Sequence, residues 1–299
     1  MIADRPALGI SLMLGFCMTA PLGDALAKIL SETVPVTQLL LVRFGTQAVV
    51  LLPIVWFANI QWRVDGPVLW LVFIRSILHI IGIGSMFISL YYLPLADAVA
   101  IAFVMPFIIL LLGKFILSEE VGPRRLTACL VGFTGTMMVI QPSFVAIGWP
   151  ALWPLVVAFS FSLFMLVTRQ IAKAVDPIGL QAISGVIACA ILVPPLILFQ
   201  DKGIQPISLI WPTFTQFWIL GAIGILGTSA HLLMTWALRL APSATLAPMQ
   251  YLEIPVATLL GWLIFADLPN RLATVGIIVT IVAGLYIILK ERAIARASA

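Results

Sequence analysis

The chain has 299 residues, of which 62% are hydrophobic and only 9% are charged, with a net charge of +4. Soluble domains carry roughly 25% charged residues, so 16 basic and 12 acidic side chains are too few to cover a globule of this length. A mean hydropathy of +1.17 and repeated uncharged runs of about 18 residues or more predict that lipid surrounds most of the surface. These features exclude a disordered chain, a disulfide scaffold, a nucleic-acid-binding protein and a water-soluble enzyme.

Apolar runs and the residues that interrupt them predict an all-α integral membrane protein with ten transmembrane helices. A spanning helix needs about 20 residues and a tight connection about 2–8, which leaves no room for a soluble domain. Turn-forming residues mark the connections, among them the segment from Pro142 to Pro150. In chain order, the expected helices cover residues 7–30, 36–57, 68–92, 95–117, 124–141, 150–172, 178–199, 216–240, 243–265 and 272–290.

Basic residues are distributed unequally between the two sides of this bundle. If the N-terminus lies inside, the inner side carries Arg5, Arg63, Arg124, Arg125, Arg169, Lys173, Arg239, Lys290, Arg292 and Arg296. The outer side carries Lys28, Lys202 and Arg271. Short loops rich in Lys and Arg stay in the cytoplasm. The bias therefore predicts that both termini are cytoplasmic.

The two halves of the chain resemble each other between residues 95–135 and 244–284. The aligned pairs are Pro106 with Pro255, Glu119 with Asp267 within one residue, and Gly135 with Gly284. Because five spans is an odd number, a second copy must enter the membrane from the opposite side. We therefore expect two inverted-topology five-helix repeats, at residues 1–145 and 146–299.

These positions also carry a resemblance to a known family. A helix with small residues and Pro106 precedes Glu119 or Glu120 and a glycine-bearing fifth helix, and the second half repeats this pattern with Pro255, Asp267, Gly276 and Gly284. Asp24, Lys28 and Arg43 stand where the family often has a polar residue, a Lys and an Arg. The chain thus resembles the EamA family of ten-helix transporters in the drug/metabolite transporter (DMT) superfamily, although Asp267 replaces the usual Glu.

The resemblance implies transport of a small molecule across the bacterial inner (cytoplasmic) membrane, without a cofactor. Relatives with this fold include amino-acid exporters, sugar-phosphate and nucleotide-sugar carriers, and S-adenosylmethionine carriers. The resemblance is therefore specific for the family and leaves the substrate open.

Charged residues inside the expected spans are the first candidates for function, because a charge in hydrocarbon costs about 2.5–3.5 kcal/mol on insertion scales. In the first span, Pro21 interrupts the backbone hydrogen bonds, and Asp24 and Lys28 share a face one turn apart. One interpretation is a broken helix that lines a polar cavity, with Asp24 as a proton or cation site. The other is a structural ion pair between Asp24 and Lys28.

The third span carries a polar stripe of Arg75, His79, Gly82, Met86 and Ser89. His79 falls near the membrane midplane, where it could bind substrate or a proton, or could simply pack in the core. Arg75 is nearer the inner end, where a long side chain can snorkel to the interface.

The eighth span repeats glycine every three residues, at positions 221, 224 and 227, which favours close helix packing. Thr228 and His231 lie on the same stripe and are candidates for a cavity wall. Core packing explains them equally well.

The ninth span contains Gln250, Tyr251 and Glu253 between Pro248 and Pro255. Non-helical polar backbone at membrane depth is tolerated only where it is buried in protein or lines a water-filled cavity. This segment is therefore the most cavity-like in the chain.

Arg43 in the second span either bonds carbonyl groups or Asp24, or binds a carboxylate or phosphate of the substrate.

The sequence contains no catalytic residues in a known motif and no metal-ligand spacing. We therefore expect a secondary transporter of small polar metabolites, most plausibly an amino-acid exporter, with a pathway lined by spans one, three, four, six, eight and nine. Protons are candidate coupling ions, a monomer suffices and a dimer is compatible. The alternatives are uptake of a nucleoside-like metabolite such as S-adenosylmethionine, and a membrane enzyme or lipid-handling protein.

Overall fold

The computed structural model describes residues 5–60, 65–116, 122–199 and 207–297. Within these residues the chain is entirely helical and contains no strand. Eight of the described helical segments are long and apolar enough to cross a membrane. The all-α membrane fold is therefore confirmed, whereas the count of ten spans and the inverted repeat stay predictions.

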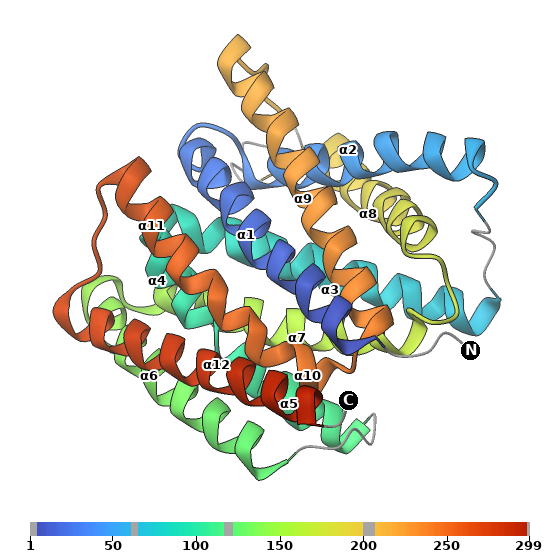
Figure 1. The fold of residues 1–299 in the computed structure, drawn as a ribbon. Coiled ribbons are helices and arrows are strands. Elements are labelled where there is room, and N and C mark those ends of the chain that lie inside the picture. Colours follow the sequence, from blue (N-terminus) through green and yellow to red (C-terminus); the bar gives the residue numbers. More distant parts are fainter. Residues whose placement is uncertain (1–4, 61–64, 117–121, 200–206, 298–299) are drawn as a thin grey trace.

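The helices follow one another along the chain, and most of the connections are short (Figure 1). The first half contains α1 (Pro6–Leu30), α2 (Val36–Phe57), α3 (Gly66–Tyr92), α4 (Leu95–Ala102), α5 (Met105–Ile116) and α6 (Pro123–Ile147). The second half contains η1 (Trp149–Leu152), α7 (Trp153–Ile171), α8 (Pro177–Phe199), α9 (Phe214–Leu240), α10 (Ser243–Leu246), η3 (Ala247–Leu252), α11 (Glu253–Phe265) and α12 (Arg271–Ala297).

Proline residues account for most differences from the expected helices. The span expected at 95–117 is interrupted at Phe103 and Val104, whose N–H groups bond carbonyls three residues back. Pro106 follows directly, and proline removes a helical donor and crowds the carbonyl four residues earlier. The span expected at 243–265 is likewise divided into α10, the 3₁₀ helix η3 and α11.

Two other prolines leave their helices intact, which corrects the sequence-based expectation. Helix α1 continues through Pro21, so it is not a broken helix. Helix α6 continues through Pro142 to Ile147, where a connection was expected. In membrane bundles, neighbouring groups can compensate the backbone groups that a proline leaves unpaired. Helix α6 ends instead at Gly148, whose φ of 71° is unfavourable for other residues.

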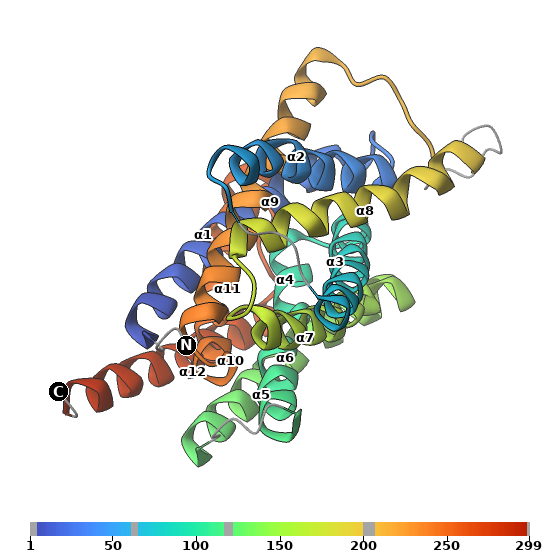
Figure 2. The same ribbon diagram turned by 90° about the vertical axis from the view of Figure 1, so that its right-hand side faces the viewer.

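Helix packing pairs the two halves of the chain throughout. Helix α1 packs along α9 and α3 along α7, while α2 packs on α8 and α6 on α12 (Figures 1 and 2). The α6–α12 contact is especially close, because a Cβ atom on Gly135 would overlap the side chain of Thr280 and lie 2.6 Å from the carbonyl oxygen of Gly276. Each half therefore depends on the other for its buried surface.

Basic side chains hold two helix C-termini at these contacts. Lys28, in the last turn of α1, donates to the carbonyl oxygens of Leu90 (3.3 Å) and Leu93 (2.7 Å) at the end of α3. Arg169, in the last turn of α7, donates to the carbonyl oxygen of Leu238 near the end of α9 at 2.7 Å. A cation at a helix C-terminus stabilises the unpaired carbonyl groups.

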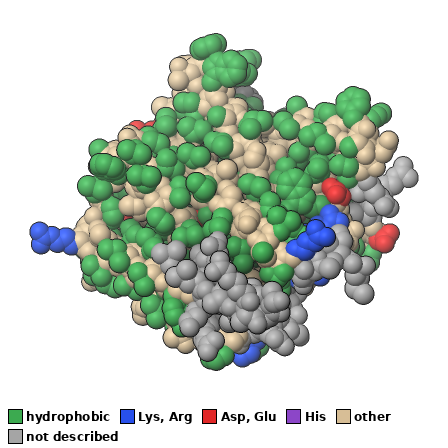
Figure 3. Space-filling model, in the orientation of Figure 1, with side chains coloured by type: hydrophobic (Ala, Val, Ile, Leu, Met, Phe, Trp, Pro, Cys, Tyr) green, Lys and Arg blue, Asp and Glu red, His purple; other side chains and the backbone are tan. Residues whose placement is uncertain are grey.

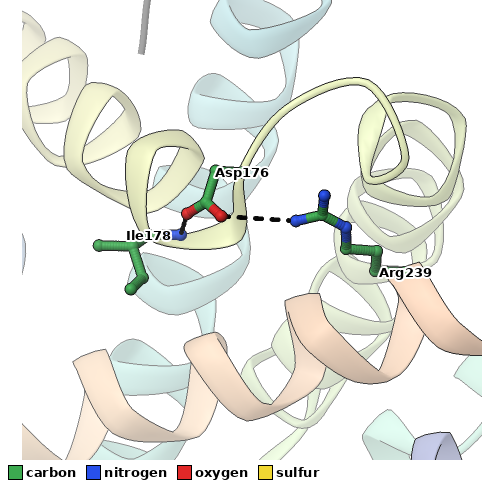
Figure 4. A network of polar contacts seen from close by, with 3 residues as sticks. All are labelled: Asp176, Ile178 and Arg239. Atoms are coloured by element: carbon green, nitrogen blue, oxygen red, sulfur yellow. Dashed lines mark hydrogen bonds and ion pairs between the residues drawn. The ribbon is translucent and has the colours of Figure 1, made fainter. Parts of the chain in front are cut away.

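An ion pair joins the start of α8 to the end of α9 (Figure 4). One carboxylate oxygen of Asp176 accepts a hydrogen bond from the N–H of Ile178 at 2.9 Å, and the other lies 3.5 Å from Nη1 of Arg239. Both side chains are partly exposed, so the pair contributes little stability. Its geometry nevertheless fixes the position of the short 172–176 connection.

Hydrophobic side chains cover most of the face shown in Figure 3, and Lys, Arg, Asp and Glu occur mainly toward its edges. Large apolar residues are also exposed along α2, α8, α9 and α11. A surface of this kind is stable in lipid and would aggregate in water. Several residues used in the sequence-based predictions, namely Arg63, Glu119, Glu120 and Lys202, lie outside the described residues, as do the side chains of Arg124, Arg125, Lys290, Arg292 and Arg296.

Candidate functional site

A cavity of about 70 Å³ lies where the two halves meet. All six spans that were expected to line a pathway contribute to it, and α2 adds Arg43. The volume holds several water molecules but is below the roughly 300–1,000 Å³ of pockets that enclose a drug-sized ligand. The polar residues in the wall are Asp24, Arg43, His231, Gln250 and Glu253; the apolar ones include Phe16, Ile83, Met86, Phe87, Val99, Phe103 and Phe161.

Arg43 and His231 form the first polar wall of the cavity. Nη2 of Arg43 lies 2.8 Å from Nδ1 of His231 and 3.4 Å from the carbonyl oxygen of Gly227. Because a guanidinium can only donate and a carbonyl oxygen can only accept, Nδ1 of His231 accepts from Arg43 in one tautomer and donates to the carbonyl oxygen of Gly227, 3.0 Å away, in the other. The missing side chain of Gly227 makes the contact possible, since a Cβ there would lie 2.7 Å from Cζ of Arg43.

Asp24, Gln250 and Glu253 form the second polar wall. Gln250 is in the 3₁₀ helix η3 and Glu253 begins α11, so the change of helix type presents both side chains to the cavity. Nε2 of Gln250 donates to the sulfur of Met165 at 3.2 Å, a weak acceptor. Asp24 is partly buried on α1 and lines the same cavity, and within the described residues no ion pair joins it to Lys28. The structural ion pair expected for Asp24 and Lys28 is therefore wrong.

Buried polar atoms without hydrogen-bond partners are divided between these two walls. Among the described residues, Nη1 of Arg43 and Nε2 of His231 are unpaired on the first wall, and Oε1 of Gln250 and Oε1 of Glu253 on the second. Buried polar groups are normally bonded, and each unpaired one costs about 1–3 kcal/mol. In the part of the chain that the structure describes, the cavity thus has an unused donor on Arg43, unused acceptors on Gln250 and Glu253, and an unpaired ring nitrogen on His231.

His79 lies next to this site but does not line the cavity. Its ring is fully buried among Phe44, Phe161 and Phe164, and its centroid is 4.3 Å from that of His231. Within the described part of the chain, neither ring nitrogen has a hydrogen-bond partner. His79 therefore supports the position of His231 by ring packing.

The remaining two predicted site residues point away from the cavity. The hydroxyl of Thr228 donates to the carbonyl oxygen of Gly224 in its own helix at 2.8 Å. Tyr251 is fully buried, packs on Phe103 with ring centroids 5.6 Å apart, and reaches the surface of α6 at Gly132. The structure thus brings Asp24, His231, Gln250 and Glu253 together and leaves His79, Thr228 and Tyr251 around them.

Arg75 does not snorkel, which corrects the sequence-based interpretation. It is fully buried, donates to the hydroxyls of Thr168 (2.8 Å) and Ser184 (2.7 Å), and its Cζ lies 4.4 Å from the ring centroid of Phe164. Because α3 packs against α7 and α8, these helices cover the Arg75 side chain and separate it from the membrane–water interface.

Sequence reasoning missed a second buried polar group, which joins α2, α8 and α9. Nε2 of Gln47 on α2 donates to the backbone oxygen of Gln181 on α8 at 2.6 Å, and Gln181 donates to the carbonyl oxygen of His231 and the hydroxyl of Thr235, both at 2.9 Å. An isolated amide inside an apolar run was the available signal, because such groups need a partner in lipid.

A bundle of apolar helices that encloses a polar cavity at the meeting of its two halves is the architecture of a membrane transporter. The model of the EamA-like transporter family matches residues 7–141 and 148–290. The chain belongs to this family, and the resemblance inferred from its sequence is confirmed. Within the described residues, no three His, Cys, Asp or Glu side chains are grouped so that they could hold a metal ion.

Named relatives cover most of the chain at low identity. A riboflavin transporter of Rhizobium johnstonii is 28% identical over 74% of this chain and 71% of its own length. An S-adenosylmethionine uptake transporter of Rickettsia bellii is 22% identical over 96% of this chain and 95% of its own length. A pseudopaline exporter of Pseudomonas aeruginosa is 22% identical over 95% of this chain and 96% of its own length. A solved crystal structure shares the fold, with a TM-score of 0.68 at 19% identity over 95% of this chain and 99% of that one.

Proposed function

We propose that this protein is a secondary transporter that moves a small polar metabolite across the bacterial inner membrane by alternating access. The observation that carries the proposal is the cavity between the two halves, with unpaired polar atoms in its walls. Its small volume supports a closed conformation, which must widen to one side before a metabolite can enter.

Pseudo-symmetric packing supports the inverted repeat that alternating access would use. In such a repeat, α1, α2, α3 and α6 of the first half would correspond in order to α7, α8, α9 and α12 of the second. Exchanging the two halves then turns the α1–α9 contact into the α3–α7 contact. The same exchange leaves the α2–α8 and α6–α12 contacts unchanged, because each joins a helix to its own counterpart. Lys28 and Arg169 occupy corresponding last turns and hold corresponding helix ends. This pattern supports the division into repeats at 1–145 and 146–299. We also propose ten spans and, from the distribution of the basic residues, that both termini lie in the cytoplasm.

The activity that we propose first is amino-acid export. The second is uptake of a nucleoside-like metabolite such as S-adenosylmethionine. The relatives named for S-adenosylmethionine uptake and pseudopaline export, which match over almost the whole chain, support transport of a small molecule in either direction. Asp24 and Glu253 are the candidates for proton coupling. One monomer contains all the residues of the cavity, so transport does not require a dimer.

Purified protein in liposomes tests the proposal directly. Uptake of labelled amino acids, S-adenosylmethionine and riboflavin is measured against empty liposomes, and we expect saturable flux of at least one solute. Glu253→Gln should reduce that flux without loss of folded protein in detergent. Absence of flux for every solute would contradict the proposal, and turnover of a lipid without solute flux would favour the enzyme or lipid-handling alternative.

Labelling of single cysteines tests the topology separately. Cysteines introduced at Ser11 and Thr33, near opposite ends of α1, should react with membrane-impermeant reagents from opposite sides of the membrane. Reaction of the Thr33 position from the cytoplasmic side would contradict the predicted orientation.

A further inference from the structure

We infer that the cavity recognises a zwitterionic aminocarboxylate group, with the carboxylate bound to Arg43 and His231 and the ammonium bound to Glu253, Gln250 and Asp24. The inference rests on the proposed transport function and names the substrate chemistry of the same cavity. It applies to both proposed substrate classes, because amino acids and S-adenosylmethionine share this group.

The first polar wall has the donors that a carboxylate requires. Nη2 of Arg43 is occupied by His231 and Gly227, whereas Nη1 of the same guanidinium is buried and unpaired. Nε2 of His231 is a second unpaired atom on this wall, and it donates to a carboxylate in the tautomer in which Nδ1 accepts from Arg43. A carboxylate accepts charge-assisted hydrogen bonds from such groups, which are about twice as strong as neutral ones.

The second polar wall has the acceptors that an ammonium group requires. Oε1 of Gln250 and Oε1 of Glu253 are both buried and unpaired, and the carboxyl group of Asp24 lines the same cavity. An ammonium group has three N–H donors and no acceptor. It can therefore bond to acceptors on η3, α11 and α1 together.

Other classes of ligand leave part of this arrangement unsatisfied. A simple anion pairs with Arg43 but leaves the acceptors of Gln250 and Glu253 empty, and a simple cation leaves Nη1 of Arg43 empty. A molecule without charges compensates neither wall, and charged groups in a dry site lose several kcal/mol without a partner. Among charged ligands, one that carries both a carboxylate and an ammonium group can compensate both walls.

The apolar part of the cavity would hold the remainder of such a substrate. Ile83, Met86 and Phe87 on α3 and Val99 and Phe103 on or next to α4 line it and present no charge. Recognition of a shared head group by fixed charges and of a variable side chain by apolar contacts is the usual division of roles in a small-molecule site.

Ligand binding to the detergent-solubilised protein tests this inference without requiring flux. The probes are L-phenylalanine, phenethylamine, which lacks the carboxylate, and 3-phenylpropionate, which lacks the ammonium. The same comparison uses S-adenosylmethionine and its decarboxylated form, and riboflavin is the uncharged probe. Affinity is measured by calorimetry and by thermal stabilisation, which rises with ligand occupancy. We expect the parent aminocarboxylate to bind at least 10-fold more tightly, in at least one series, than the analogues that lack its carboxylate or its ammonium, and riboflavin to bind more weakly than that parent compound.

Two variants assign the two ends of the ligand. Arg43→Gln should weaken binding of the zwitterion about 10- to 100-fold and leave the amine-only probe unchanged. Glu253→Gln should weaken binding of the zwitterion and leave binding of the acid-only probe unchanged. Arg75→Gln is the matched control, because Arg75 is equally buried but lies outside the cavity, so its loss should not alter the preference between probes.

Each outcome separates this inference from the proposed function. Saturable riboflavin flux with weaker aminocarboxylate binding would overturn the inference and keep the transport function. Arg43-dependent binding of a zwitterion without flux would support the inference and contradict transport. If Arg43→Gln lowered the binding affinity of all probes equally, Arg43 would only maintain the structure, and the inference would be overturned.

Discussion

Substitution of Gly227 by alanine tests whether the contact between Arg43 and His231 organises the cavity. A Cβ at position 227 would lie 2.7 Å from Cζ, 2.8 Å from Nε and 2.9 Å from Nη2 of Arg43. These distances are too short, so the guanidinium must move away from Nδ1 of His231, which it now contacts at 2.8 Å. Because the clash involves the end of a flexible side chain, the helix itself does not need to move.

The expected magnitude follows from the hydrogen bond that the displaced guanidinium can no longer donate to the proposed substrate carboxylate. A hydrogen bond that involves a charged group contributes about 1.5–3 kcal/mol, which at about 1.4 kcal/mol per factor of ten corresponds to roughly 10- to 100-fold in substrate affinity. Alanine also favours a helix over glycine by roughly 0.5–1 kcal/mol. Gly227→Ala should therefore raise KM at least 10-fold in liposomes while thermal unfolding in detergent changes little.

The same helix provides the control for this variant. A Cβ on Gly221 would meet no atom within 4 Å, so Gly221→Ala should gain the helical preference and keep the wild-type KM. If Gly227→Ala transported with the same KM as Gly221→Ala, the Arg43–His231 contact would have no role in substrate binding. A large loss of stability in Gly227→Ala would equally refute the reasoning, because the predicted effect is confined to one side chain.

Three further substitutions test the packing around the site. Gly135→Ala places a Cβ against Thr280 and the α12 backbone, so it should destabilise the protein by about 1–3 kcal/mol in a denaturant titration; unchanged stability would show that α6 and α12 can separate at little cost. Lys28→Met removes two hydrogen bonds to the end of α3 and should lower stability by about 1 kcal/mol, whereas the exposed Lys114→Met should have no effect. His79→Phe preserves the ring packing beside the cavity, so KM should stay at the wild-type value; loss of binding would place the imidazole of His79 in direct contact with substrate.

The membrane class and most of the helix bounds follow from local sequence alone. Twenty or so apolar residues without charges have one stable environment, so helices such as Val36–Phe57 are predicted to the residue. The same cost of burying charge identifies functional candidates, because a polar residue such as Glu253 or His231 is retained in a span only with a partner, water or a role. Four of the seven predicted residues consequently line one cavity.

The roles of individual residues depended on their neighbours in space. Pro21 and Pro106 are the same residue type in comparable apolar runs, yet α1 continues through the first and the chain between α4 and α5 is interrupted before the second. Arg43 and Arg75 also look alike in the sequence. One lines the cavity beside Gly227, whereas the other is sealed between α3, α7 and α8 by Phe164 and two hydroxyls.

Periodicity along one helix determines which side chains share a face, and it contains no information about what that face meets. The unpaired polar atoms of Arg43, His231, Gln250 and Glu253 come from four helical segments separated by up to about two hundred residues of chain. Only the packing of α1 on α9 and of α2 on α8 brings them to one cavity. The sequence alone thus determined a bundle of apolar helices that contains polar residues whose burial costs free energy. The tertiary structure decided which of those residues face each other.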